Sequence, residues 1–292
     1  MTVVEAQSRD SDGILDCWNA GSLFDVLTPA LLEEKVWQDP GLEESRTVVA
    51  REGEAVLGFA QAVSRPAFDV LKSVVVRPEW RRKGIGSRLA HRVLAGWSRE
   101  IRVAESAPNY LTPGLDVRDE GSQAFLETLG FREFGRTVNL RVDLGNLPRA
   151  GNVPGFRLAR AQPSDRAAVL ELIERIWPAW RGEVEAALRR SLPGLFLAWT
   201  GDAVAAFSAH DANNRGTGWF GPMGTDPDHR GRGLGRELLV RSLLDLRRGG
   251  QEQAVIPWVG PIEFYADAVG ARVDRRFVRL KRESVLGQDS PD

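Results

Sequence analysis

The sequence predicts an α/β fold made of two similar domains, and three observations support this prediction. The chain has 292 residues, which is about twice a common domain length of roughly 150 residues. A glycine-containing segment occurs twice, as VRPEWRRKGIG at 76–86 and as TDPDHRGRGLG at 225–235. The same order of predicted strands and helices surrounds both segments, so the two halves are interpreted as copies of one mixed domain.

The composition is that of a globular protein with an ordinary hydrophobic core. Hydrophobic residues make up 42% and charged residues 27% of the chain, and the formal net charge is -1. This balance argues against a general nucleic-acid binder. Cys17 is the single cysteine, so an intrachain disulfide and a cysteine-based metal site are excluded. The three histidines are scattered without metal-ligand spacing, so no metal is expected.

The location of the protein is also predicted from what its sequence lacks. The N-terminus has no basic start followed by an apolar stretch, as a signal peptide would. The longest apolar runs are far shorter than the roughly 20 residues that a bilayer requires. We therefore expect a cytoplasmic protein without a membrane partner. Only four of the 39 basic residues are lysines, which indicates a bacterial source with a GC-rich genome.

In the first half, each predicted element follows from a local pattern. Residues 2–7 read as a strand, and the Asp/Ser cluster at 8–11 marks the start of a helix. The segments TVVARE (47–52) and AVLGFAQAV (55–63) form a predicted hairpin around a glycine turn. The helix after the glycine segment is amphipathic, because its apolar residues recur at spacings of three and four. They are Ile85, Leu89, Val93, Leu94 and Trp97.

The second half repeats this order. FRLARA (156–161) is a predicted strand, and PSDRAAVLELIERIW (163–177) is a predicted helix. LFLAW and AVAAFSAH form the hairpin, and the later helix has Leu234, Leu238, Leu239 and Leu243 on one face. Between the halves, GNLPRAGNVPG is rich in glycine and proline and lacks apolar periodicity, as a linker does. The predicted domains are 1–147 and 156–285, with a linker at 148–155 and a tail at 286–292.

The glycine segments have a physical use as anion sites. A strand that ends in Arg-x-x-Gly-x-Gly and opens into a helix presents unpaired backbone N–H groups to an anion. Arg81, Arg82, Arg230 and Arg232 add charge that a diphosphate accepts in paired hydrogen bonds. A dinucleotide fingerprint is excluded because the third glycine is missing, and a P-loop is excluded because Lys83 precedes Gly84. The alternative is a glycine-rich turn with solvated arginines, which two copies in one context disfavour.

With these residues in place, both segments resemble the acyl-CoA motif of the GNAT superfamily of N-acyltransferases, which has fused two-domain members. The resemblance implies two GNAT-like domains, each a mixed, curved, mostly antiparallel sheet flanked by helices. Its fourth and fifth strands splay apart to admit the pantetheine arm. In the first copy, the implied acetyl-CoA contacts are Val74, Val76, Arg81, Arg82, Lys83, Gly84, Ile85, Gly86 and Ser87. In the second copy they are Met223, Thr225, Arg230, Gly231, Arg232, Gly233, Leu234, Gly235 and Arg236.

The resemblance also implies a catalytic acid in the second half. Family members often use a tyrosine in the helix after the fifth strand to protonate the leaving thiolate, and Tyr265 occupies that place. Its distance to Gly270 is one residue longer than usual, which on a regular helix rotates the hydroxyl by about 100°. The alternative is an aromatic side chain packed under the loop. The first half has Leu126 at this place and cannot donate a proton there, unless Tyr110 in a nearby loop substitutes.

The general base is not identified by the sequence. Family members commonly use a glutamate on the fourth strand, but the corresponding positions hold Phe68 and Thr217. His210, Asp211 and Glu263 are the alternatives. The chain has nine tryptophans, and three of them lie on or beside predicted strands of the second half. Trp199, Trp219 and Trp258 are interpreted as core residues, with an aromatic substrate wall as the alternative.

The resemblance implies an N-acetyltransferase. It would transfer an acetyl or short acyl group from CoA to the amine of a small molecule by direct attack. The C-terminal domain is expected to be catalytic, and the N-terminal one to be structural or a second, unproductive CoA site. The alternatives are a non-enzymatic acyl-CoA-binding protein with decayed sites and an acyltransferase for protein amines. The chain is expected to be a monomer, with its copies packed as a pseudo-dimer, or a homodimer.

Overall fold

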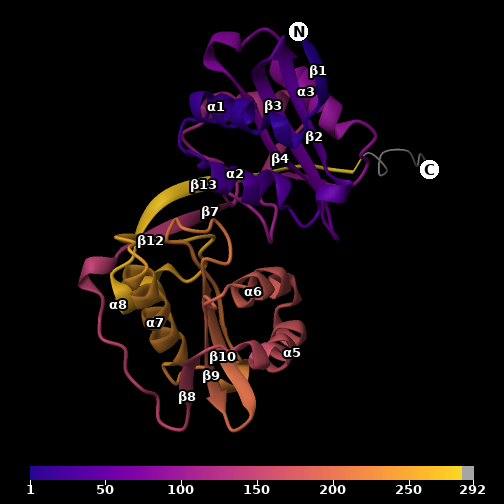
Figure 1. The fold of residues 1–292 in the computed structure, drawn as a ribbon. Helices are drawn as coiled ribbons and strands as arrows, with labels where there is room; N and C mark the ends of the chain where they lie inside the picture. Colours follow the sequence, from indigo (N-terminus) through magenta and orange to yellow (C-terminus); the bar gives the residue numbers. More distant parts are fainter. Residues whose placement is uncertain (285–292) are drawn as a thin grey trace, which may run out of the picture. The chain divides into compact units, whose positions relative to one another are not determined.

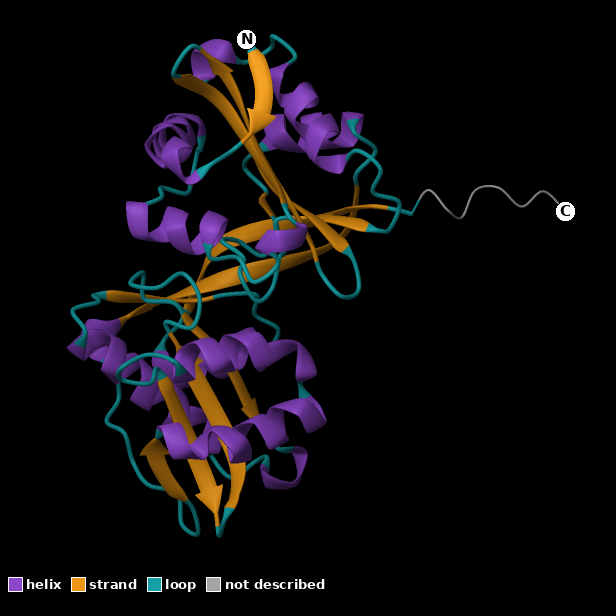
Figure 2. Ribbon diagram, turned by 45° about the vertical axis from the view of Figure 1, so that its right-hand side comes forward, coloured by secondary structure: helices purple, strands orange, loops and turns teal. Residues whose placement is uncertain are grey.

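The computed structural model describes residues 1–284, so the tail predicted at 286–292 lies outside the described part. Residue contacts group the described chain into two units, one formed by residues 1–137 and 276–284, and one by residues 138–275. Each unit combines mostly antiparallel strands with flanking helices (Figure 2), which confirms the predicted α/β class. We call them the N-terminal and the C-terminal unit.

The N-terminal unit is a twisted sheet with helices on both faces. Its strands follow the order β1-β2-β3-β4-β5-β13, and β6 pairs with β13 (Arg272–Arg282). Helix α1 packs on β3 and β4 from one face, and α3 packs on β2, β3 and β4 from the other. The strands and helices are β1 (Thr2–Glu5), α1 (Ser11–Gly21), α2 (Pro29–Leu32), β2 (Arg46–Glu52), β3 (Ala55–Ser64), β4 (Asp69–Val76), α3 (Ile85–Leu94), β5 (Ile101–Val103), β6 (Leu115–Asp116) and α4 (Glu120–Thr128).

The C-terminal unit repeats this plan. The strands β8 to β11 form an antiparallel sheet in the order β11-β10-β9-β8. Helices α5 and α6 lie on one side of β9 and β10, and α7 lies on the other side (Figure 1). Its elements are β8 (Arg157–Arg160), α5 (Arg166–Ile176), α6 (Arg181–Leu188), β9 (Leu195–Thr200), β10 (Ala203–His210), β11 (Phe220–Thr225), α7 (Leu234–Arg248), β12 (Gln253–Ile256) and α8 (Ile262–Val269).

The predicted amphipathic helices pack as their spacing indicates. In α3, Ile85, Leu89 and Val93 are buried against the sheet of the N-terminal unit. In α7, Leu234 and Leu238 pack on one part of the sheet, while Leu239 and Leu243 pack in the cluster that includes α8. Spacings of three and four place these side chains on one face of each helix, so the pattern predicted both the helices and their buried sides.

The last strand of each unit comes from the other half of the sequence. Strand β7 (Arg132–Asp143) begins in the N-terminal unit, and its residues 138–143 belong to the C-terminal unit, where they pair with β12. Strand β13 (Arg272–Arg282) begins in the C-terminal unit, and Lys281 and Arg282 pair with β5 of the N-terminal unit. The contact units therefore do not coincide with the linear domains expected at 1–147 and 156–285. Strand patterns do not reveal which sheet a strand joins.

The segment expected as a linker, 148–155, packs along α7 within the C-terminal unit. Val153 is buried with Leu234 and Leu238. The guanidinium of Arg241 donates to the Gly151 carbonyl at 2.9 Å, and the Gly151 amide donates to the Glu237 carboxylate. This segment lacks helix and strand but is held to the helix by these contacts.

Candidate active site

Both glycine loops adopt the same backbone path between a strand and a helix. In the second loop, β11 ends at Thr225, and Gly231 and Gly233 have positive φ angles of 74° and 84°. In the first loop, Arg82 and Gly84 have φ angles of 61° and 77° at the corresponding positions. Left-handed backbone suits glycine because it has no Cβ, and Arg82 adopts it in spite of its side chain.

The helix that follows each loop has an open N-terminus. Gly84 and Gly233 are the N-cap residues of α3 and α7, and no side chain caps either helix. Their unpaired first-turn N–H groups and the positive end of the helix dipole favour an anion. An added Cβ at Gly84, Gly231 or Gly233 would meet no protein atom within 4 Å. The space in front of both loops is therefore open to a ligand such as a diphosphate.

Two of the motif arginines, Arg81 and Arg230, use donors to bind backbone carbonyls rather than directing all of them to the open side of the loops. Arg81 donates to the carbonyl oxygens of Val76 and Gly21, which ties the first loop to the end of α1. Arg230 donates through Nε to the Thr225 carbonyl at 3.3 Å. Lys83 lies over the Trp80 ring at 4.3 Å. Arg81 and Arg230 thus also hold the loops in shape.

The remaining predicted contact residues lie close to their own loop. Ile85 and Leu234 are buried, so only their backbone faces the loop, while Lys83 and Arg236 are exposed. Arg236 also pairs with Glu237 at 3.3 Å. The structure thus forms two groups, one in each unit. They are Val74, Val76, Arg81, Arg82, Lys83, Gly84, Ile85, Gly86 and Ser87, and Met223, Thr225, Arg230, Gly231, Arg232, Gly233, Leu234, Gly235 and Arg236.

The strand before each loop leaves its parallel neighbour partway along its length. Strand β4 pairs with β5 only at residues 69–71, and residues 73–77 are partly exposed. Strand β11 meets β12 only through a bridge between Trp219 and Val255, and residues 221–223 are half exposed. The splayed strands expected from the resemblance are present in both units. The free backbone edge is suited to hydrogen-bond an extended arm. We call each opening the slot of its unit.

Tyr265 lies on α8 beside the second loop. Its neighbour Phe264 lies under the loop, with Cζ 3.6 Å from the Cβ that Gly235 would carry. Phe125 takes the same place under Gly86 at 3.5 Å, so Leu126 is the structural counterpart of Tyr265. Tyr265 also packs edge-on against Phe220 of β11, with ring centroids 6.4 Å apart. This contact brings the Tyr265 ring to the start of the slot.

The extra residue between Tyr265 and Gly270 lies in the C-terminal part of α8 and the turn after it, beyond the tyrosine. The Tyr265 carbonyl accepts from the Ala271 amide at 3.3 Å, and the Leu126 carbonyl accepts from the Phe131 amide at 3.2 Å. Both helices thus close on equivalent residues, although the closing loop of α8 is one residue longer. Because Phe264 and Phe125 face their loops alike, the irregular spacing does not rotate Tyr265 away from the loop.

The electrostatic environment suits Tyr265 to donate a proton. Burial raises the pKa of Tyr265 to about 12, so the phenol stays protonated at neutral pH. A neutral phenol in an apolar setting can transfer its proton to a thiolate as negative charge develops on sulfur.

The three alternatives for the base have different surroundings. His210 lies under α7, where its Nε2 is 2.9 Å from Asp245 Oδ2. Burial alone would raise the pKa of Asp245, but hydrogen bonds from His210 and Arg160 outweigh it and lower this pKa. Asp211 is 3.3 Å from Arg190, and Glu263 is exposed on α8. None of these contacts identifies a base, and all three stay predictions.

An aromatic cluster that sequence reasoning missed covers the opposite face of β11. Trp177 and Trp180 stack with ring centroids 5.3 Å apart, and both pack edge-on against Phe207. A Cβ at Gly224 would lie 2.6 Å from the Trp177 ring, so glycine lets this ring approach the strand. The signal was Trp-Pro-Ala-Trp, because a short 3-10 turn places residues three apart on one side. Trp199 and Trp219 are buried core residues, as predicted.

Within residues 1–284, no group of histidine, cysteine and carboxylate side chains is arranged to hold a metal ion. In the same part of the chain, no helix is long and apolar enough to cross a membrane. Burial raises the pKa of the Cys17 thiol to about 11, so this cysteine stays protonated at neutral pH.

The two loops, the two slots and the repeated topology define a tandem acyltransferase fold. Residues 43–133 match the family model described as an acetyltransferase (GNAT) domain, and residues 163–256 match that of the acetyltransferase (GNAT) family. The chain therefore belongs to the GNAT acetyltransferases and carries two of their domains in tandem.

Curated relatives extend the similarity over most of the chain. A protein named mycothiol acetyltransferase from Propionibacterium freudenreichii is 26% identical, over 95% of this chain and 86% of its own length. A protein of the same name from Mycolicibacterium paratuberculosis is 29% identical, over 89% of this chain and 87% of its own length. Both relatives are bacterial.

Solved structures agree on the fold. A GCN5-related N-acetyltransferase from Sphaerobacter thermophilus has a TM-score of 0.71 at 18% identity, covering 97% of this chain and 95% of its own. A tandem GNAT protein from the clavulanic acid biosynthesis pathway has a TM-score of 0.68 at 17% identity, covering 100% of this chain and 99% of its own. At these identities the likeness shows the fold alone.

Proposed function

We propose that this protein transfers an acetyl group from acetyl-CoA to the amine of a small molecule, and that its C-terminal unit performs the reaction. The observation that carries the proposal is the position of Tyr265, a protonated phenol beside both an open helix N-terminus and a slot. The name of the relatives makes mycothiol-related amines the first acceptors to test.

The residues of the second loop fit the co-substrate. The uncapped N-terminus of α7, with Gly231 and Gly233, would hold the diphosphate, and the free edge of β11 would bind the pantetheine arm. The predicted contacts, from Met223 and Thr225 to Arg230 and Arg236, would surround this path.

The reaction follows from this placement. The neutral amine attacks the thioester carbonyl carbon, a C–N bond forms, and the C–S bond breaks. A backbone N–H at the free edge of β11 would stabilise the negative oxygen of the tetrahedral intermediate. Tyr265 gives its proton to the departing thiolate, and the amine loses its own proton to a base or to water. We further propose that the protein acts in the cytoplasm, as a monomer or a homodimer.

Calorimetry and turnover together test the proposal. Acetyl-CoA should release heat on binding, and free CoA should accumulate when the acceptor of mycothiol acetyltransferases is added. Binding without turnover across a broad panel of amines would instead favour a non-enzymatic acyl-CoA-binding protein. Turnover confined to protein substrates would replace the small-molecule acceptor by a protein amine. No binding at micromolar protein would overturn the proposal.

A further inference from the structure

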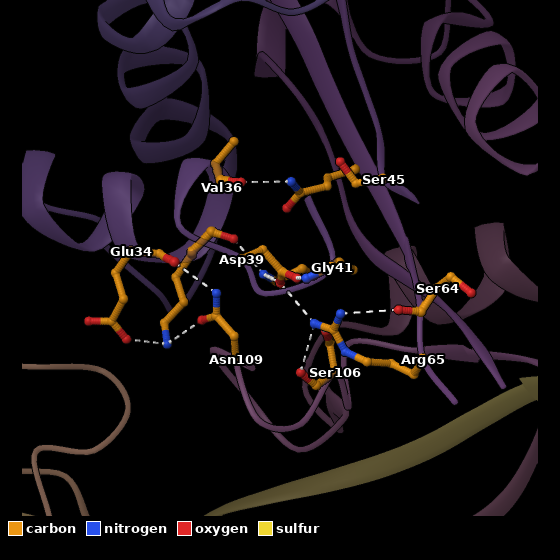
Figure 3. Close-up of polar contacts among 12 residues, drawn as sticks. Glu34, Val36, Asp39, Gly41, Ser45, Ser64, Arg65, Ser106 and Asn109 are labelled. Atoms are coloured by element: carbon orange, nitrogen blue, oxygen red, sulfur yellow. Dashed lines mark hydrogen bonds and ion pairs between the residues drawn. The ribbon is translucent and has the colours of Figure 1, made fainter. Parts of the chain in front are cut away.

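Several buried charged side chains contact one another within the N-terminal unit (Figure 3). Their centre is Asp39, whose side chain is 0% exposed. The Asp39 carboxylate accepts from Arg65 Nη2 at 2.8 Å, from the Gly41 amide at 2.8 Å and from the Lys72 ammonium. Arg65 also donates to the Ser106 hydroxyl at 2.6 Å. We call these side chains, Asp39, Arg65, Lys72 and Ser106, the Asp39 network.

A second group of polar side chains adjoins this network. Lys35 Nζ donates to Glu34 at 2.7 Å and to Asn109 Oδ1 at 3.0 Å. Asn109 in turn donates to the Glu34 carbonyl at 2.8 Å, and Figure 3 shows Asn109 facing Glu34. The Lys35 carbonyl accepts from Lys72 Nζ, which joins the two groups. The segment after α2 is thereby tied to the sheet and to the loop after β5.

Lys72 stands at the point where the N-terminal slot begins. The pairing of β3 with β4 shifts register at this residue, because Gln61 pairs with Ser73 while Ala62 pairs with Leu71. Lys72 is the bulged residue, and β4 pairs with β5 only up to Leu71. Its side chain is 6% exposed and points to the face covered by α1 and α2 rather than to the face of α3. Lys72 thus lies where the reactive end of a bound arm would lie.

The C-terminal unit has a glycine at the same place. Between the pairs His210–Phe220 and Ser208–Met223, strand β11 carries two residues where β10 carries one. The bulge therefore contains Gly221, the counterpart of Lys72. A Cβ on Gly221 would meet no atom within 4 Å. One slot begins at a buried ammonium, and the other begins at open space.

This difference bears on which slot an amine can enter. If the diphosphate of acyl-CoA is bound at the N-terminus of α3 or α7, its pantetheine arm lies on the face of the sheet that this helix covers. The helix that carries Leu126 or Tyr265 lies on the same face. An amine must then approach the thioester from the other face, which α1 and α2 cover in the N-terminal unit. We infer that the Asp39 network closes this amine side, so that the N-terminal unit can hold acyl-CoA but accepts no amine, with Lys72 as the residue that decides it. The inference rests on the proposed function.

Stability alone does not explain such a network. Buried ion pairs are weak stabilisers, because desolvation of both charges offsets their attraction. Lys72 is also poorly suited to attack a thioester itself. Burial lowers the pKa of Lys72 to about 8, and the neighbouring Asp39 carboxylate opposes this shift by favouring the ammonium. Its donors are directed to Asp39 and to the Lys35 carbonyl.

The small number of lysines makes a direct test possible. Lys35, Lys72, Lys83 and Lys281 are the four lysines of the chain. The intact protein is treated with an amine-acetylating N-hydroxysuccinimide ester and mapped by mass spectrometry. Lys83 should react more than about 100-fold faster than Lys72, because a buried group reacts only through opening of the fold. Comparable rates would show an open amine side and overturn the inference.

A pair of variants then tests the role of Lys72. Lys72→Gly copies the C-terminal unit and leaves a cavity with the shape of butylammonium beside Asp39, whereas Lys72→Met fills this cavity with an uncharged chain. Butylammonium should raise the Tm of Lys72→Gly and leave that of Lys72→Met unchanged. An equal response of both folded variants, or none in Lys72→Gly, would overturn the inference. Neither test uses acetyl-CoA binding as its readout, so a protein that binds no acetyl-CoA would overturn the proposed function separately.

Discussion

The two slots and their loops follow a similar backbone path, and three of the differences between their residues bear on function. Both strands bulge before their loop, both loops carry left-handed residues at equivalent positions, and both helices start uncapped. At the acid position, Leu126 replaces Tyr265, and at the bulge, Lys72 replaces Gly221. In the loop, Arg82 replaces Gly231. The features that suit binding are backbone features found twice, whereas those that suit chemistry are side-chain features found in the C-terminal unit.

This difference shows that binding and catalysis have separate requirements in this fold. An anion site made of N–H groups tolerates many side chains, as long as the φ angles and the open space are kept. Proton transfer requires one group at one place, and access for an amine requires an empty volume. By the proposals above, the N-terminal unit meets the first requirement only. This supports a division of labour between the units.

Substitution of Tyr265, the proposed general acid, should have the largest effect on turnover. Tyr265→Phe removes the hydroxyl and keeps the ring, so turnover should fall by about 10²- to 10⁴-fold, the usual range for a general acid. The matched control is Tyr110→Phe, because Tyr110 is the second tyrosine of the chain. Release of free CoA measures both variants. An unchanged rate in Tyr265→Phe would remove Tyr265 from the reaction and erase this difference between the slots.

The pH dependence of the rate tests the same role of Tyr265. Because burial raises the pKa of Tyr265 to about 12, the phenol keeps its proton as the pH rises through 10. The rate should therefore show no falling limb from this group between pH 8 and pH 10. A fall in this range that disappears in Tyr265→Phe would contradict the buried position of the hydroxyl.

The Asp39 network predicts a large effect on stability in the N-terminal unit. Asp39→Asn leaves Lys72 and Arg65 as buried cations without their carboxylate, so the free energy of unfolding should fall by about 3–5 kcal/mol. The double change Asp39→Asn with Lys72→Met removes one of these cations and should recover part of the loss. Urea unfolding of both variants measures this. A loss below 1 kcal/mol would mean that the network is loosely formed.

Lowering the pH should reduce the stabilisation that Asp39 and Lys72 give to the fold. Burial alone would raise the pKa of Asp39, but Lys72 and Arg65 outweigh burial and hold it below its ordinary value of 3.8. A depressed carboxyl pKa stabilises the fold above the unfolded pKa, and this contribution disappears as the pH falls through the folded one. The stability difference between wild type and Asp39→Asn should therefore be constant near pH 7 and shrink below about pH 4.

The strand exchange predicts that the end of the sequence stabilises the first unit. Val278 and Leu280 are buried in the core cluster that also contains Leu89 and Leu126. Leu280→Ala should lower the free energy of unfolding of the N-terminal unit by about 2–5 kcal/mol. Hydrogen exchange measures protection in β5 and α3, with Leu192→Ala on an exposed side chain as control. Lost protection in β9 and β10 instead would contradict the exchange.

The sequence predicted the elements whose cause is local. The hairpins, the amphipathic helices and the two loops depend on neighbouring residues, and each lies where it was expected. The exchange of β7 and β13 was not predicted, because an alternating strand pattern does not identify its partner. Tyr265 could be placed by its motif, but its orientation depended on how the extra residue before Gly270 is absorbed, which only the backbone of α8 shows.

Other parts of the site depend on contacts between distant segments. Asp39, Arg65, Lys72 and Ser106 are spread over three loops and a strand, and no spacing in the sequence joins them. Trp177 and Trp180 carried a local signal in their spacing, but their approach to β11 depends on Gly224, 44 residues beyond Trp180. Sequence reasoning therefore located the glycine loops better than the side chains that surround the two slots.

The smallest expected effect comes from exchanging Arg82 and Gly231, which tests whether the backbone conformation or side-chain contacts stabilise each loop. Arg82 has a φ of 61°, where the second loop has Gly231 at 74°. A non-glycine residue in this region costs about 1–2 kcal/mol, and glycine returns about 0.5–1 kcal/mol of that through its larger unfolded-state entropy. Arg82→Gly should therefore stabilise the N-terminal unit by about 0.5–1 kcal/mol, and Gly231→Arg should destabilise the C-terminal unit by a similar amount. Urea unfolding measures both changes. If Arg82→Gly is destabilising instead, contacts of the Arg82 side chain outweigh the backbone strain. The two loops would then share a backbone path but differ in the interactions that stabilise it.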